Sequence, residues 1–192
     1  MKKLLSLVAW GIAACAVCSN AQAEEFGRQG VTSLGADRLT GLYLVDVGSS
    51  ALQLGVGAAP VFAPQPYTST RFAVDHFVNP SLSVGGTLAF WLKSGATVEG
   101  RRNRANGYLV APRVGYVLPF TDGFGFWPRG GINFWDLGTD DEFGITAEAT
   151  FYGALGQQFG LTFGPTADLG IVGEGAEGVS LGLMSVGLFG WL

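Results

Sequence analysis

Residues 81–92, with the sequence SLSVGGTLAFWL, alternate between two kinds of side chain. The even positions are apolar or glycine, and the odd positions are mostly small or polar. Because successive side chains of a β-strand point to opposite faces, this segment would form a strand with one apolar face. A transmembrane β-strand needs roughly 9–11 residues and alternates between a lipid face and a lumen face. A water-soluble sheet can show the same alternation, so the membrane interpretation depends on the recurrence of such segments behind an export signal.

Similar segments recur to the last residue and predict eight strands in all. They lie within 28–47 and at about 69–78, 81–93, 107–119, 123–137, 142–155, 158–172 and 179–192. The first strand is expected to bend, because its alternation slips near Asp37 and Arg38. Tight turns are expected at 79–80, 120–122 and 156–157, and the other links, 48–68, 94–106, 138–141 and 173–178, vary and can be longer. Short turns alternating with longer loops are typical of outer-membrane barrels. The sequence thus predicts an all-β, eight-stranded antiparallel up-and-down transmembrane β-barrel with both termini in the periplasm.

The first 23 residues have the features of a secretory signal peptide. Lys2 and Lys3 form a positive start, residues 4–17 are apolar, and Ala21-Gln22-Ala23 fits the rule for cleavage before Glu24. We therefore expect a signal peptide at 1–23 and one barrel domain at 24–192. An alternative is a lipobox, Ile12-Ala13-Ala14-Cys15, in which Cys15 would be lipidated. Both alternatives export the protein beyond the inner membrane.

The composition of the exported chain excludes several classes of protein. Both cysteines, Cys15 and Cys18, precede residue 24, so no disulfide is expected. Removing Lys2 and Lys3 from the 11 basic residues leaves 9 against 15 acidic ones, a net charge of −6. This charge argues against a nucleic-acid partner. Beyond residue 23 no stretch reaches the ~18 consecutive apolar residues that a membrane helix needs.

The phase of each strand predicts which side chains face lipid and which face the lumen. The lipid face would carry Phe72, Val74, Val78, Val110, Val114, Tyr116, Leu118, Phe124, Phe126, Ile132, Phe134, Phe143, Ile145, Phe151, Phe159, Leu161, Phe163, Leu169 and Ile171, with His76 near the periplasmic end. The opposite phase holds three arginines and three carboxylates: Arg71, Asp75, Arg113, Arg129, Glu148 and Asp168. A lone buried charge is very costly, so we expect these six to pair in a salt-bridge network that fills the lumen.

Several motifs resemble those of small bacterial outer-membrane β-barrel proteins with OmpA- and OmpX-like architecture. They are the hairpin at 75–85 (DHFVNPSLSVG), Ala111–Pro119 with Trp127–Gly131, and Gly164-Pro165 followed by Asp168-Leu169-Gly170. Together they cover most of the exported chain. Most members of this family have no assigned activity, so the resemblance implies a fold and a location but no reaction. The chain departs from the family at its end, where Phe189 and Trp191 lie one position off the usual frame of a terminal aromatic residue. The facing of the last strand therefore stays open.

Candidate catalytic and metal sites are poorly supported by the sequence. Lipid A-modifying barrels use a histidine near a serine and an acid. His76 is the only histidine, and its neighbour Asp75 would point to the opposite face of the strand. An acidic loop with Asp136, Asp140, Asp141 and Glu142 could attract Ca²⁺, but it lacks EF-hand spacing and is better explained as a solvated turn. We expect no catalytic residue, no cofactor and no resident metal.

The loop after the third strand contains a basic group that points to a lipid partner. Lys93, Arg101, Arg102 and Arg104 would face the phosphates of lipopolysaccharide, although an ordinary solvated loop is the favoured explanation of these residues. The expected partners are outer-membrane lipid, lipopolysaccharide and, during biogenesis, the barrel assembly machinery. A closed barrel has no free edge, so a monomer is expected.

Three functions remain open at this point. The favoured one is a non-enzymatic integral barrel with a structural or surface-interaction role. A second is a narrow channel or carrier for small or hydrophobic molecules, for which the lumen glycines Gly85, Gly115, Gly125, Gly131 and Gly164 could leave space. A third is a soluble periplasmic barrel that holds a lipophilic ligand, which would require the apolar phase to point inward.

Overall fold

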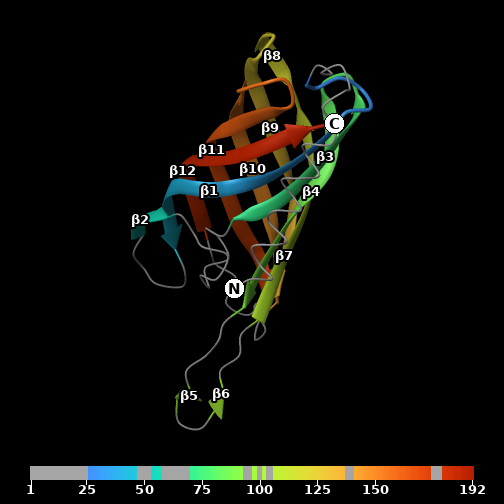
Figure 1. The fold of residues 1–192 in the computed structure, drawn as a ribbon. Coiled ribbons are helices and arrows are strands. Elements are labelled where there is room, and N and C mark those ends of the chain that lie inside the picture. Colours follow the sequence, from blue (N-terminus) through green and yellow to red (C-terminus); the bar gives the residue numbers. More distant parts are fainter. Residues whose placement is uncertain are drawn as a thin grey trace, which may run out of the picture.

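Eight antiparallel strands close into a barrel in the computed structural model, which describes residues 26–46, 53–57, 70–92, 97–98, 101–102, 106–136, 141–173 and 179–192 (Figure 1). The wall consists of β1 (Thr32–Asp46), β3 (Arg71–Asn79), β4 (Leu82–Leu92), β7 (Asn106–Tyr116), β9 (Phe124–Asp136), β10 (Asp141–Ala154), β11 (Phe159–Gly173) and β12 (Val179–Trp191). Each strand pairs with the next, and β12 pairs with β1 to complete the ring. The all-β, up-and-down barrel predicted from the alternation is confirmed.

Four short strands accompany the eight strands of the wall in the described residues. β8 (Leu118–Thr121) continues β7 and pairs with β9, while β2 (Gln53–Gly57) pairs with the second half of β1. β5 (Thr97–Val98) and β6 (Arg101–Arg102) form a separate hairpin in the link between β4 and β7. The turn expected at 120–122 is therefore misplaced by about two residues. Phe120 and Thr121 belong to β8, because Thr121 pairs with Phe124, and the turn falls at Asp122 and Gly123.

The two ends of the barrel differ in their connections. We call the end with the short links at 80–81, 122–123 and 155–158, where β1 begins and β12 ends, the turn end, and the other the loop end. Figure 1 shows the β8–β9 hairpin at the turn end and the β5–β6 hairpin at the loop end. In the part of the chain that is described, no helix is long and apolar enough to cross a membrane.

Some predictions fall outside the described residues. These are the signal peptide at 1–23, the lipidation of Cys15, and the loop residues Lys93, Arg104 and Asp140. For Arg101 and Arg102 the structure describes the backbone of β6 alone.

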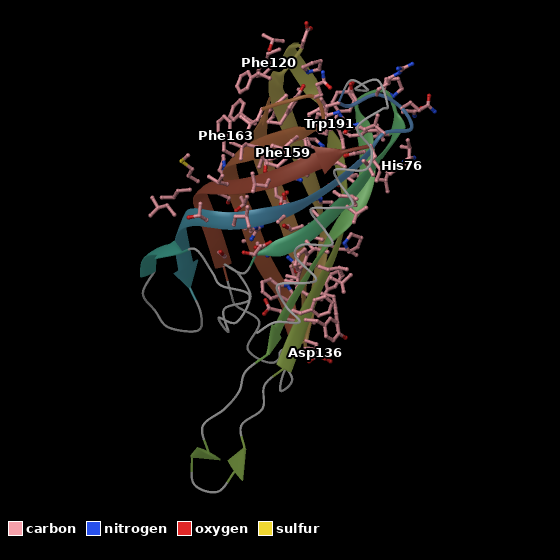
Figure 2. All side chains as sticks on the ribbon, viewed as in Figure 1. His76, Phe120, Asp136, Phe159, Phe163 and Trp191 are labelled. Carbon is pink, nitrogen blue, oxygen red and sulfur yellow. The ribbon has the colours of Figure 1, made fainter. Side chains whose placement is uncertain are left out.

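The outer surface of the barrel is apolar on every strand of the wall. Phe72 on β3, Val114 on β7 and Ile171 on β11 are each more than half exposed, and all the side chains predicted to face lipid lie outward, exposed or partly so. Figure 2 shows Phe120 and Phe163 on the outside of the barrel. Burial alternates strictly along β3, in the pattern expected for a sheet with lipid on one side. The outward facing predicted for side chains of the second, fourth, fifth, sixth and seventh strands is thus confirmed.

The first strand contains an irregularity that directs two neighbouring side chains inward. Ala36 pairs with Leu188 but Thr40 pairs with Val186, so β1 has two residues more than β12 in this stretch. Arg38 takes a left-handed backbone conformation (φ 58°), which is uncommon for a residue other than glycine. As a result both Asp37 and Arg38 are buried in the lumen. This bulge is the phase slip expected near these two residues.

The facing of the last strand, left open by the sequence, is settled by burial. Phe189 and Trp191 are 5% and 4% exposed and point into the lumen, whereas Leu192 is 51% exposed. The terminal aromatic residues are off the usual frame because they pack inside the barrel and not against lipid.

Candidate functional site

The lumen holds a network of eight buried charged side chains midway along the barrel. The six residues predicted from the strand phase, Arg71, Asp75, Arg113, Arg129, Glu148 and Asp168, are all at most 5% exposed and all take part. The bulge in β1 adds Asp37 and Arg38, which the sequence reasoning did not assign to the network. Four arginines then face four carboxylates, so the network as a whole is neutral.

One half of the network is centred on Asp168 of β11. Arg71 of β3 donates from Nη2 to Asp168 Oδ2 at 2.8 Å and from Nη1 to Oδ1 at 3.3 Å. Arg38 of β1 also donates to both oxygens of Asp168. Two arginines thus clamp one carboxylate, the arrangement in which charge-assisted hydrogen bonds are strongest.

The other half is centred on Arg113 of β7. Its Nη1 lies 2.6 Å from Asp37 Oδ2 and 3.1 Å from Glu148 Oε2, and its Nε donates to Asp75 Oδ1 at 3.0 Å. Arg129 of β9 reinforces this half through Glu148 at 2.8 Å and Asp37 at 3.2 Å. A contact of 3.7 Å between Arg38 and Glu148 joins the two halves.

Aromatic residues close the network on both sides. Toward the turn end, the guanidinium of Arg129 lies 4.4 Å from the ring centre of Trp127. Toward the loop end, the guanidinium of Arg71 lies 5.8 Å from the ring of Trp135. Both tryptophans are buried and donate their indole N–H, Trp127 to Ser83 at 3.2 Å and Trp135 to Asn133 at 2.7 Å. The charges are therefore buried between aromatic side chains, where the attraction between opposite charges is far stronger than at a surface.

Two of the lumen glycines lie directly against neighbouring atoms. A Cβ atom at Gly115 would lie 2.7 Å from Ser83 Oγ and 2.7 Å from Trp127 Nε1, and one at Gly131 would lie 2.8 Å from Arg113 Cα. Neighbouring side chains and strands fill the space that these glycines leave. The prediction that they could provide room for a solute is wrong at these two positions.

The loop-end half of the lumen combines a buried apolar cluster, formed by Ala89, Leu109, Ala111 and Trp135, with buried polar side chains. Thr87 Oγ1, Asn133 Nδ2, Thr146 Oγ1 and Ser180 Oγ are buried and have no hydrogen-bond partner among the described residues. Glu142 also points inward, 7% exposed, so this member of the predicted acidic loop belongs to the wall of the barrel. The polar part of this lining does not suit a lipophilic molecule, because uncompensated burial of polar groups is costly.

Chemical groups suited to catalysis or metal binding are not brought together in the described structure. The outward-facing His76 has its Nδ1 3.0 Å from the hydroxyl of Thr32, and Asp75 points to the other face as the strand phase predicts. Among the described residues no group of three or more histidine, cysteine or acidic side chains is placed to hold a metal ion. Asp136 and Asp141 pair across β9 and β10, and among the residues that the structure describes no third acid joins them in a metal-binding group.

The sequence matches no protein-family model and no curated protein. Solved structures similar to it include Neisserial surface protein A, with 12% sequence identity over 84% of this chain and 99% of that chain, and a TM-score of 0.52. Another is Ail, the attachment invasion locus protein of Yersinia pestis, in complex with the heparin analogue sucrose octasulfate, with 8% identity over 85% of this chain and 98% of that chain, and a TM-score of 0.50. These likenesses show that the chain has the fold of the small eight-stranded outer-membrane barrels.

Proposed function

We propose that this protein is an integral barrel of the outer membrane with a structural or surface-interaction role and no catalytic activity. One observation carries the proposal: the closed wall is apolar outside and encloses a neutral network of paired charges. An apolar belt on every strand suits lipid, and a lumen filled by side chains suits a small barrel that transports nothing. The soluble alternative needs the apolar phase inside, and the described strands have it outside.

Membrane fractionation tests the location. We expect the protein to stay with outer membranes after carbonate extraction, to dissolve in detergent, and to migrate faster on a gel before boiling than after it. Release by carbonate without such a shift would contradict an integral barrel. An outer-membrane barrel with an even strand number would place both termini in the periplasm, and protease access to tags on either side of the membrane tests this orientation.

Conductance separates the favoured role from a channel. The Arg113 and Asp168 centres span the lumen, so we expect no stable openings when the refolded protein is inserted into a planar lipid bilayer. Regular openings in the wild-type protein, lost in Arg113→Ala, would show instead that the network lines a conducting path.

The absence of catalysis is supported by the surroundings of His76. Its described hydrogen-bond partner is Thr32, and neither a serine nor an acid is bonded to its ring among the described contacts. Hydrolysis or transfer of acyl chains in vesicles that contain lipid A, lost in His76→Gln, would contradict this part of the proposal.

A surface role would use the basic residues of the loop that contains β5 and β6. We propose that Lys93, Arg101, Arg102 and Arg104 contact lipopolysaccharide phosphates, and that assembly proceeds through the barrel assembly machinery to a monomer. Charge-assisted bonds to phosphate support the contact with lipopolysaccharide. The double variant Arg101→Gln/Arg102→Gln should then bind lipopolysaccharide micelles more weakly than the wild-type barrel, and equal binding would assign these arginines to a solvated loop.

A further inference from the structure

The segment that precedes β1 enters the turn end of the barrel. Phe26 lies among five aromatic rings that project from four strands of the wall. The distances between ring centres are 4.8 Å to Phe189, 4.9 Å to Tyr152, 5.1 Å to Trp127, 5.2 Å to Phe77 and 5.4 Å to Trp191. All five surrounding rings are buried, together with Val31 and Val117. The Phe26 side chain thus lies at the centre of an aromatic cluster, formed by Phe77, Trp127, Tyr152, Phe189 and Trp191, that lines the lumen at the turn end.

Backbone hydrogen bonds fix the segment in this position. Gly30 N–H donates to Phe77 O at 2.9 Å, Phe77 N–H donates to Val31 O at 2.9 Å, and Ser81 N–H donates to Gly27 O at 2.8 Å. Gly27 and Gly30 have φ of 90° and 93°, a backbone conformation that glycine adopts without strain. The segment therefore turns sharply twice before β1, which directs Phe26 into the lumen.

From this geometry we propose that residues 26–31 are a plug that seals the turn end and keeps water from the charge network. The plug goes beyond the proposed function, because an integral barrel can have an open end. Phe26 packs on Trp127, and Trp127 lies under the guanidinium of Arg129, so the plug covers the network through one intervening ring. Excluding water on this side strengthens each ion pair beneath it.

The plug is joined to the wall by few backbone bonds. Ser81 N–H, in the turn between β3 and β4, donates to Gly27 O, and the two bonds of Gly30 and Val31 with Phe77 continue the pairing of β1 with β3 beyond Thr32 and His76. Withdrawal of residues 26–30 would break the backbone bonds of Gly27 and Gly30 and expose the five buried aromatic side chains, whereas the pairings between the wall strands involve none of these residues.

Thiol accessibility tests the plug in the full chain with Cys15 and Cys18 replaced by serine, refolded into detergent micelles. The reporter is Thr150→Cys. Thr150 is 3% exposed, and along β10 it lies between Tyr152, which belongs to the aromatic cluster, and Glu148, which belongs to the charge network. The probe is a small anionic methanethiosulfonate. We expect the reporter to react slowly with Phe26 in place and about tenfold or more faster in Phe26→Ala, because reaction requires the end to be open.

Two controls make the result specific. Phe159→Ala also removes a phenyl ring, but from the outer face, where Phe159 is 45% exposed. This variant should leave the reaction rate of Thr150→Cys unchanged. Thr146→Cys, buried on the loop-end side of Glu148, should react at the same rate with or without Phe26. Fast reaction of Thr150→Cys in the presence of Phe26, or no change in Phe26→Ala, would overturn the plug.

Folding is checked separately, so failure of the plug and failure of the barrel are distinguishable. Each variant must show the shift in migration on boiling that the closed wall predicts. Should Phe26→Ala fail to fold, Phe26→Leu keeps apolar bulk without the ring contacts, and the reporter is then expected to react faster by a smaller factor. A Phe26→Leu barrel that folds and protects the reporter as well as the wild-type chain does would overturn the proposal.

Discussion

Arg113 is the residue on which the lumen network most depends. It bonds Asp37, Asp75 and Glu148, which come from three other strands of the wall. Removing one partner of a buried ion pair destabilises the folded protein strongly, because the other charge stays buried without compensation. A guanidinium group can bind three carboxylates at once because it presents several hydrogen-bond donors in one plane.

Arg113→Ala should therefore destabilise the barrel strongly. Three carboxylates would share the remaining arginines, and removing one member of a buried ion pair costs about 3–5 kcal/mol. Urea unfolding in phospholipid vesicles, followed by tryptophan fluorescence, measures this loss. Arg113→Lys keeps the charge but not the planar donors, so its loss should be smaller. Equal stability of the alanine variant and the wild-type protein would show that the network contributes little.

Six of the eight network residues could be predicted from the sequence because they follow the phase of regular strands. Asp37 and Arg38 could not be assigned, since two adjacent residues of a regular strand face opposite sides and only the bulge turns both inward. Phe26 was missed as well. It precedes the first predicted strand, where no periodicity indicates a direction for its side chain.

At the scale of strands, the register of β7 and β9 depends on close contact of their backbones. Gly131 pairs with Arg113, and a Cβ atom there would lie 2.8 Å from Arg113 Cα. Its neighbour Gly130 has its nearest contact at 3.6 Å, to Thr146 O. Two adjacent glycines thus have different roles, which the composition alone does not distinguish.

We expect Gly131→Ala to destabilise the barrel and Gly130→Ala to be tolerated. An added methyl group at residue 131 must push β7 and β9 apart, and such overpacking typically costs about 1–3 kcal/mol. Urea unfolding of both variants in the same vesicles gives the comparison. If residue 131 tolerates alanine as well as residue 130 does, the close contact between the two backbones does not constrain the register.

For the whole molecule, the alternation predicted the order of the strands and their facing, because lipid imposes the same requirement on every strand of the wall. The short strands β2, β5, β6 and β8 were not predicted. Their segments carry no long alternation, and β2 and β8 form by pairing with a neighbour that already exists. The ends of the wall strands differ from the predicted ends by a few residues, because pairing with a neighbouring strand and not the alternation decides where a strand stops.

A charge on the outer face should cost more near the middle of the wall than at its end. Ile132 is 46% exposed on β9 and Phe120 is 58% exposed on β8, beside the turn. We expect Ile132→Lys to lose about 2–4 kcal/mol and Phe120→Lys about 0–1 kcal/mol, because the penalty depends on depth in the bilayer. Unfolding in vesicles measures both losses. Similar small losses at the two positions would indicate that Ile132 does not face lipid.

The choice of strands that the ion pairs connect also constrains how the barrel enters a membrane. Its ion pairs join strands that are far apart in the chain, such as β3 with β11 and β1 with β7. A hairpin of β3 and β4 that entered lipid alone would carry Arg71 and Asp75 without the partners that later strands supply. Each unpaired arginine at the midplane would cost about 2–4 kcal/mol. Insertion strand by strand is therefore unfavourable, and the chain must gather its strands before or while it crosses the bilayer.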